Sequence, residues 1–148
     1  MPPPEWHHLQ RELEQLCLVN GMENAYVRDA WGNRWCSGRP FSRYAGAEID
    51  AAVNAAVSAC APSLPRGGKL DTVIELSGRR ALVVSFAGVY LLVVEYRTPA
   101  ETLVASAQRQ AMVRKATLGA LPKIERLTLA LPPPAGPGSG SAEGVGTA

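Results

Sequence analysis

The stretch from Ala81 to Tyr96, ALVVSFAGVYLLVVEY, is the most apolar part of the chain and limits its fold more than any other. A membrane-spanning helix needs roughly 20 consecutive apolar residues, so this run is too short to cross a bilayer. β-branched and aromatic residues stand on both sides of Ala87-Gly88, and this composition is typical of strands. We therefore predict two antiparallel strands, at about 80–87 and 89–96, joined by a tight turn.

A third strand is predicted immediately before this pair. In LDTVIELS the residues alternate between two faces, with Leu70, Thr72, Ile74 and Leu76 on one and Asp71, Val73, Glu75 and Ser77 on the other. Such alternation indicates a half-solvated strand, and Ser77-Gly78 suits a hairpin turn. Residues 70–96 are thus expected to form a three-stranded meander. Because its later strands are apolar on both faces, helices should cover the sheet.

Two helices and a shorter hairpin are predicted before the meander. Apolar residues at helical spacing predict a first helix that ends at Asn20-Gly21. The segment AYVRDAWGNRWCSG predicts a hairpin that turns at Gly32-Asn33. The segment AGAEIDAAVNAAVSACAPSL predicts an alanine-rich second helix. One face of that helix is expected to carry Ile49, Val53, Ala56, Val57, Cys60 and Leu64.

The part after the meander predicts a third helix and a tail. Thr98 or Pro99 should start the helix, Gly119 should end it, and Pro122 should break any continuation. The segment LPKIERLTLAL fits either a helix or a strand, and we prefer a helix. The Pro/Gly/Ser-rich residues 132–148 are expected to be disordered. We therefore predict one domain over residues 1–131.

The element order α-ββ-α-βββ-α predicts an α+β fold. Its five strands would form one antiparallel sheet flanked by helices, in two or three layers.

Charge and cysteine content exclude several classes of protein. The net charge is only +2 at pH 7 and no basic stripe stands out, so we expect no nucleic-acid binding. The cysteines Cys17, Cys36 and Cys60 are odd in number and widely spaced, which fits neither a disulfide framework nor a zinc site. Buried free cysteines and a reducing compartment are expected. The N-terminus does not have the pattern of a secretory signal, so we expect a cytoplasmic protein.

Residues able to carry chemistry are few. The two histidines, His7 and His8, are adjacent on the first helix, whereas a metal pair on a helix needs a spacing of three or four residues. The sequence Arg66-Gly67-Gly68-Lys69 precedes a strand rather than a helix, so it is no phosphate loop. We expect solvated histidines, no metal, no cofactor and no enzymatic activity. Trp31, beside the hairpin turn, either folds back onto the sheet or contacts a partner.

Two features favour association with another protein. Strand 70–77 is half polar and lies where a sheet edge could be, and the second helix is rich in alanine. An edge strand and a close-packing helix are natural devices for dimerisation or docking.

The pattern resembles the Roadblock family, the dynein-light-chain-type domains also found in bacterial GTPase regulators. The segments that carry the resemblance are AYVRDAWGNRWCSG, AEIDAAVNAAVSAC, LDTVIELSGRRALVVSFAGVYLLVVEYRTP and AETLVASAQRQAMVRKA, which together cover about residues 5 to 120. Profilin, longin and PAS-type sensory domains share related arrangements. The extra residues after Gly119 depart from the family pattern.

The resemblance implies a non-catalytic, dimeric regulator or scaffold that binds a Ras-like small GTPase or its regulators. Such domains join their third strands and pack their second helices side by side, and gliding-motility members activate a partner GTPase. Carried onto this sequence, the expected dimer or partner interface comprises Ile49, Val53, Ala56, Val57, Thr72, Val73, Ile74 and Glu75. The second subunit would be another copy or a Roadblock paralogue. The alternatives are a small-molecule-sensing PAS- or profilin-like domain and an adaptor subunit of another complex.

Overall fold

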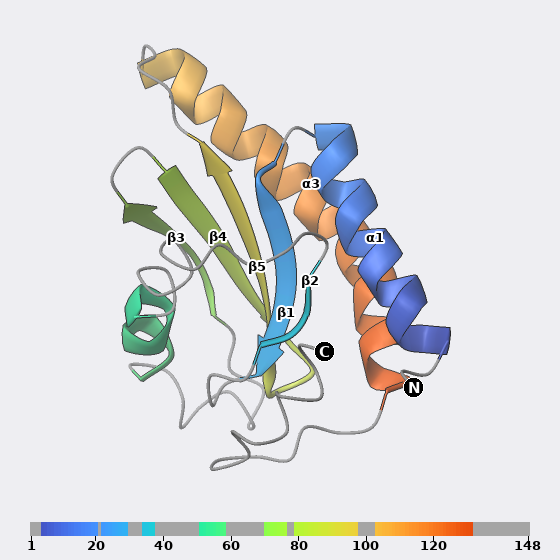
Figure 1. Ribbon diagram of the computed structural model, residues 1–148. Coiled ribbons are helices and arrows are strands. Elements are labelled where there is room, and N and C mark those ends of the chain that lie inside the picture. The colour runs from blue at the N-terminus through green and yellow to red at the C-terminus, as the bar shows by residue number, and fades with distance from the viewer. Residues whose placement is uncertain are drawn as a thin grey trace.

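The fold combines helices with one antiparallel sheet (Figure 1). The computed structural model describes residues 4–20, 22–29, 34–37, 51–58, 70–76, 79–97 and 103–131. In chain order, the elements are α1 (Pro4–Asn20), β1 (Asn24–Asp29), β2 (Arg34–Ser37), helix 51–58, β3 (Asp71–Leu76), β4 (Arg79–Phe86), β5 (Tyr90–Arg97) and α3 (Leu103–Leu129). The predicted α+β class is confirmed. The predictions for Trp31, the turn at Gly32-Asn33, Ile49, Cys60 and the tail 132–148 lie outside the described residues.

The sheet has five strands in the order β2-β1-β5-β4-β3. Each neighbouring pair is antiparallel. The expected position of strand 70–77 at a sheet edge is confirmed, because β3 pairs only with β4 in the described part of the chain. Strand β5, the most apolar one, lies in the middle and is paired on both sides.

The apolar run 81–96 forms most of the β4–β5 hairpin. Phe86 pairs with Tyr90, and their rings stack with centroids 5.5 Å apart. Between them, Ala87 and Gly88 have φ angles of 53° and 83°. Positive φ is the conformation that glycine adopts readily and alanine adopts at a cost. The predicted strand pair and tight turn are confirmed.

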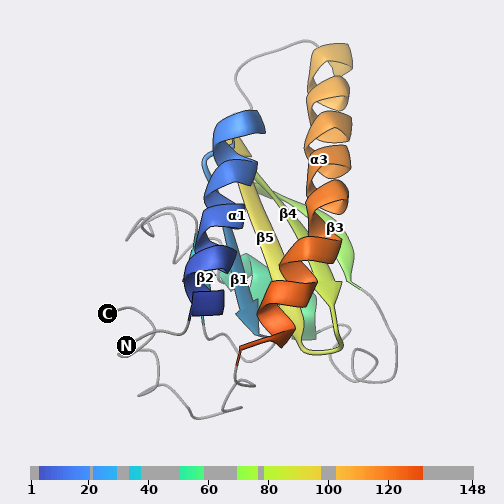
Figure 2. The same ribbon diagram turned by 90° about the vertical axis from the view of Figure 1, so that its right-hand side faces the viewer.

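One face of the sheet is covered by α1 and α3 (Figure 2). Alternate residues of the three central strands, such as Val27, Leu82 and Leu92, point to this face. They pack against Leu9 and Leu13 of α1 and against buried residues of α3. This is the larger part of the apolar core, and its burial is the main stabilising contribution to the fold.

The other face of the sheet carries the remaining alternate residues. Tyr26, Val83 and Val93 pack there against Val53 and Val57 of helix 51–58. The sheet is therefore covered on both faces, as expected from strands that are apolar on both sides.

The third helix differs from its prediction. It runs without a break from Leu103 to Leu129, through Gly119 and Pro122, so the predicted end at Gly119 and break at Pro122 are wrong. A proline inside a helix removes one backbone hydrogen bond and costs about 3 kcal/mol. Continuing the helix buries Ile124 against the core, and burying an isoleucine side chain stabilises by about 1.5–3 kcal/mol. Leu121 and Leu127 also pack against this core, and Leu131 is buried in it, so the packing of the whole segment outweighs the cost of the proline.

Stability should fall at high pH because of two buried tyrosines. Burial, followed by the nearby charge of Asp29, raises the pKa of Tyr90 above its ordinary value of 10.0. Burial also raises the pKa of Tyr96. Because the protonated tyrosine is favoured in the folded state, each tyrosine contributes its full stabilisation below pH 10.0, the ordinary pKa. This stabilisation is lost as the pH rises through the raised pKa of the folded state.

Urea denaturation at rising alkaline pH measures this loss. Tyr90→Phe should remove the part of the pH dependence due to Tyr90 and retain the part due to Tyr96. A free energy of unfolding that stays constant above pH 10.0 would contradict the expectation.

Candidate partner interface

The outer edge of β3, which no described strand pairs with, is the first part of the candidate interface. The amide of Ser85 donates to the carbonyl of Leu70 at 2.8 Å, so the backbone of Leu70 faces β4. Directly opposite residues in an antiparallel pair alternate between bonded and non-bonded pairs. Counted along the register from Leu70, the backbone groups of Asp71, Val73 and Glu75 point away from β4. The edge therefore presents donors and acceptors to which another strand can pair.

The side chains of β3 divide between the two faces of the sheet. Ile74 packs with the cluster beneath helix 51–58, and Val73 packs with the cluster beneath α1 and α3. Thr72 is half-buried, and Glu75 is exposed. Predicted interface residues 72–75 are therefore brought together at the edge, but Val73 and Ile74 also contribute to the chain's own core.

Helix 51–58 is the second part of the candidate interface. Its position beside β3 is visible in Figure 1 and follows from the contacts of Leu70 and Ile74 with the cluster of Val53 and Val57. Val53 and Val57 are buried against the sheet and Ala56 is half-buried. The expectation that Val53 and Val57 face a partner is wrong, because the chain's own sheet already covers them. The exposed residues of the helix are Ala51, Asn54, Ala55 and Ser58.

A buried arginine fastens this helix to the sheet. Arg28 of β1 is fully buried. Its Nη2 donates to Oδ1 of Asn54 at 2.8 Å, and its Nε donates to the carbonyl oxygen of Asp29 at 3.0 Å. A buried guanidinium needs such acceptors because it remains charged at every accessible pH. Arg28 was not singled out from the sequence, since an arginine in a strand gives no signal of burial.

Replacing Asn54 with alanine should loosen helix 51–58 without unfolding the sheet. A hydrogen bond to a charged group contributes about 1.5–3 kcal/mol when buried, and this one is only partly buried. We expect a loss of about 1.5 kcal/mol, which makes amide exchange in residues 51–58 about tenfold faster. Ser58→Ala, on the same exposed side, should leave the exchange unchanged. Equal exchange rates in both variants would show that Arg28 does not anchor the helix.

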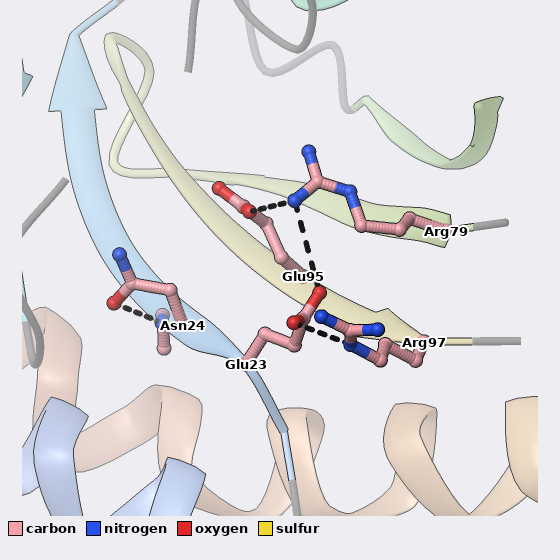
Figure 3. Close-up of polar contacts among 6 residues, drawn as sticks. Glu23, Asn24, Arg79, Glu95 and Arg97 are labelled. Atoms are coloured by element: carbon pink, nitrogen blue, oxygen red, sulfur yellow. Dashed lines mark hydrogen bonds and ion pairs between the residues drawn. The ribbon is translucent and has the colours of Figure 1, made fainter. Parts of the chain in front are cut away.

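A charged cluster lies on the face of the sheet that helix 51–58 covers. It stands at the end of the sheet away from the β4–β5 turn (Figure 3). Arg97 pairs with Glu23 at 2.8 Å, and Arg79 lies 3.8 Å from Glu23 and 4.0 Å from Glu95. Asn24 accepts a bond from the amide of Ala25. The two carboxylates and two guanidiniums balance each other in formal charge, so the cluster has no net attraction for a charged ligand.

The other residues considered for chemistry are dispersed. His7 and His8 are exposed on α1, as predicted, and His7 contacts the ring of Trp6. Within the described ranges, no three histidine, cysteine, aspartate or glutamate side chains gather as a metal site would require. Cys17 is a buried free thiol, as expected.

None of the described helices is both long enough and apolar enough to span a membrane.

Comparison with known proteins rests on structure. No protein-family model and no curated protein matches the sequence. A solved structure described as MglB with tetrameric arrangement is 15% identical, covers 86% of this chain and 92% of its own, and has a TM-score of 0.62. Myxococcus xanthus MglB is 10% identical, covers 84% of this chain and 95% of its own, and has a TM-score of 0.53.

A Roadblock/LC7 domain from Streptomyces avermitilis is 20% identical, covers 72% of this chain and 96% of its own, and has a TM-score of 0.47. The chain shares the fold of the two MglB structures, in agreement with the Roadblock-type arrangement expected from its sequence.

Proposed function

We propose that this chain is a non-catalytic, dimeric regulator or scaffold of a bacterial cytoplasm, and that it binds a Ras-like small GTPase or its regulators. The observation that carries the proposal is the outer edge of β3, unpaired within the described part of the chain and lying beside helix 51–58. Two copies would pair their β3 strands in one continuous sheet. Their helices 51–58 would then lie side by side.

The physical case for pairing is the outer edge of β3, whose backbone groups meet no other strand among the described residues. An exposed strand edge tends to pair with another chain unless charge or cover prevents it. On β3, Asp71 pairs with Arg114 and Glu75 pairs with Arg80. Neutralising these carboxylates removes much of the like-charge repulsion that two β3 strands would otherwise feel.

The helix surface supports the second half of the proposal. Ala51, Ala55 and Ser58 are small and exposed, so another backbone can approach closely. The likeness to a structure described as MglB with tetrameric arrangement supports self-association. The GTPase as partner is drawn from the Roadblock family, whose fold this chain shares.

An affinity experiment with nucleotide control tests the proposed partner. The tagged chain is used to capture proteins from the native lysate, once with GDP and once with a GTP analogue, and bound proteins are identified by mass spectrometry. The proposal expects a small GTPase in one nucleotide state. Ala55→Arg, which places a large cation on the exposed side of helix 51–58, should reduce the capture, whereas Leu18→Arg on α1 should not.

The same experiment separates the regulator from the adaptor. Retention of another Roadblock-type protein or a kinase, without a GTPase, would make the chain an adaptor of a different complex. A chain that stays monomeric at high micromolar concentration and retains no GTPase would refute the proposal.

A further inference from the structure

The outer side of α3 carries an apolar stripe that no described element covers. It comprises Leu103, Val104, Ala107, Ala111, Leu118 and Leu129, all exposed. The exposed fractions of the four larger residues are 90%, 68%, 41% and 55% for Leu103, Val104, Leu118 and Leu129. Spacings of four, seven and eleven residues place these side chains along one side of a helix.

The stripe is separate from the surface by which α3 is held to the fold. The buried residues of α3 are Val113, Thr117, Ile124 and Thr128. In Figure 2, α1 lies next to α3 and both helices lie on the same face of the sheet. The N-terminal end of α3 extends past the end of the strands. The helix has 27 residues, which corresponds to a length of about 40 Å. Arg114 and Glu125 lie on the same side of the helix and interrupt the stripe. Large exposed apolar side chains rimmed by charged residues mark an interaction surface.

The charges of α3 indicate what kind of partner fits. Its basic residues are Arg109, Arg114, Lys115, Lys123 and Arg126, and its single acidic residue is Glu125. Arg114 and Lys123 are engaged by Asp71 and Glu12. Lys115 and Arg126 are exposed beside the stripe and form no ion pair within the described residues. Against these two cations stands the one carboxylate of Glu125, so the surroundings of the stripe keep an excess of positive charge.

This charge decides against a second copy of α3 as the occupant. Two such helices packed through their stripes would bring basic residues together, and like-charge contacts destabilise an interface. An acidic surface is complementary. A helix with apolar residues at the seam and glutamates on its flanks would cover the stripe and neutralise Lys115 and Arg126.

We propose that the outer side of α3 is a docking surface for an acidic amphipathic helix of a partner protein. The surface uses none of the residues of the β3 edge or helix 51–58. The inference therefore rests on other residues than the proposed dimer and the proposed GTPase, and it is tested separately from them.

Two designed helical peptides, each about four heptads long, test this with the full chain. Both have a leucine and alanine seam, and they differ only in flanking glutamates or flanking lysines. Fluorescence anisotropy is expected to show about tenfold or more tighter binding of the acidic peptide, and this preference should weaken as salt is raised.

Matched variants locate the site. Leu118→Glu should weaken binding of the acidic peptide at least about tenfold, because it places a carboxylate in the apolar seam. Leu18→Glu makes the same change at an exposed leucine of α1 and should leave binding unchanged. The double variant Lys115→Glu, Arg126→Glu should reverse the preference between the two peptides. All these positions are exposed, so circular dichroism should show unchanged folding.

Three results would overturn the inference. Equal binding of both peptides would show that charge does not select the partner. An equal loss in Leu118→Glu and Leu18→Glu would place the site elsewhere. Binding to vesicles of phosphatidylserine and phosphatidylcholine, with no binding of the acidic peptide, would make α3 a membrane-surface helix instead.

Discussion

Replacing Glu75 with proline is expected to convert a dimer of this chain into monomers, while Glu75→Ala leaves the dimer intact. The backbone of Glu75 points away from β4. Proline removes its amide donor and places a ring at the edge, where a second strand would approach. Because this amide is not needed for pairing with β4, the chain's own sheet should tolerate the change.

The alanine variant is the control for the lost side chain. Both substitutions remove the ion pair between Glu75 and Arg80, in which the glutamate is largely exposed. Exposed pairs contribute at most about 1 kcal/mol, so both variants should melt within a few degrees of the parent chain. Only proline removes the donor.

Sedimentation equilibrium provides the measurement. We expect the dissociation constant of the dimer to rise at least tenfold in Glu75→Pro, which corresponds to about 1.4 kcal/mol. It should change little in Glu75→Ala. A Glu75→Pro chain that remains dimeric would place the seam outside β3.

The second large effect is expected at Val53. Val53→Asp should destabilise the isolated subunit itself, because Val53 lies fully buried between helix 51–58 and the sheet. A carboxylate without a partner in such a site costs about 3 kcal/mol or more. The helix should leave the sheet, and the free energy of unfolding should fall by that amount.

Ala55→Asp is the matched control, since it introduces the same side chain on the exposed side of the same helix. Urea denaturation should show little change for Ala55→Asp and a large loss for Val53→Asp. If both variants unfolded at the same urea concentration, helix 51–58 would not be docked as described.

The sheet could be predicted because its signals are local. Alternation in β3, the β-branched composition of β4 and β5, and the turn at Gly88 all agree with their final positions. When local preference and tertiary packing favour the same structure, sequence reasoning succeeds.

The continuation of α3 could not be predicted for the opposite reason. Gly119 and Pro122 are local signals for a helix end, yet a side chain at Gly119 would meet nothing within 4 Å, and Ile124 is buried further along the same helix. The contacts that hold the second half of α3 come from α1 and the sheet. These contacts are distant in sequence and leave no local pattern.

The candidate interface was predicted in part. Periodicity identifies Val53 and Val57 as one apolar face, but it does not say whether the chain's own sheet or a partner covers that face. Arg28 gave no signal, because arginine is usually exposed. Periodicity also does not say whether the apolar stripe on α3 is covered by the chain's own fold, since exposed and buried apolar residues look alike in a sequence.

One ion pair connects the two proposed interaction surfaces. Asp71 belongs to the β3 edge, and its partner Arg114, at 2.7 Å, belongs to α3. A strand that joins the edge and a helix that joins α3 would each change the surroundings of this pair. Two ligands that act on one shared contact influence each other's affinity by the same factor in both directions. Binding of a helix to α3 would then change the affinity between the subunits, and dimerisation would change the affinity of α3 for its helix.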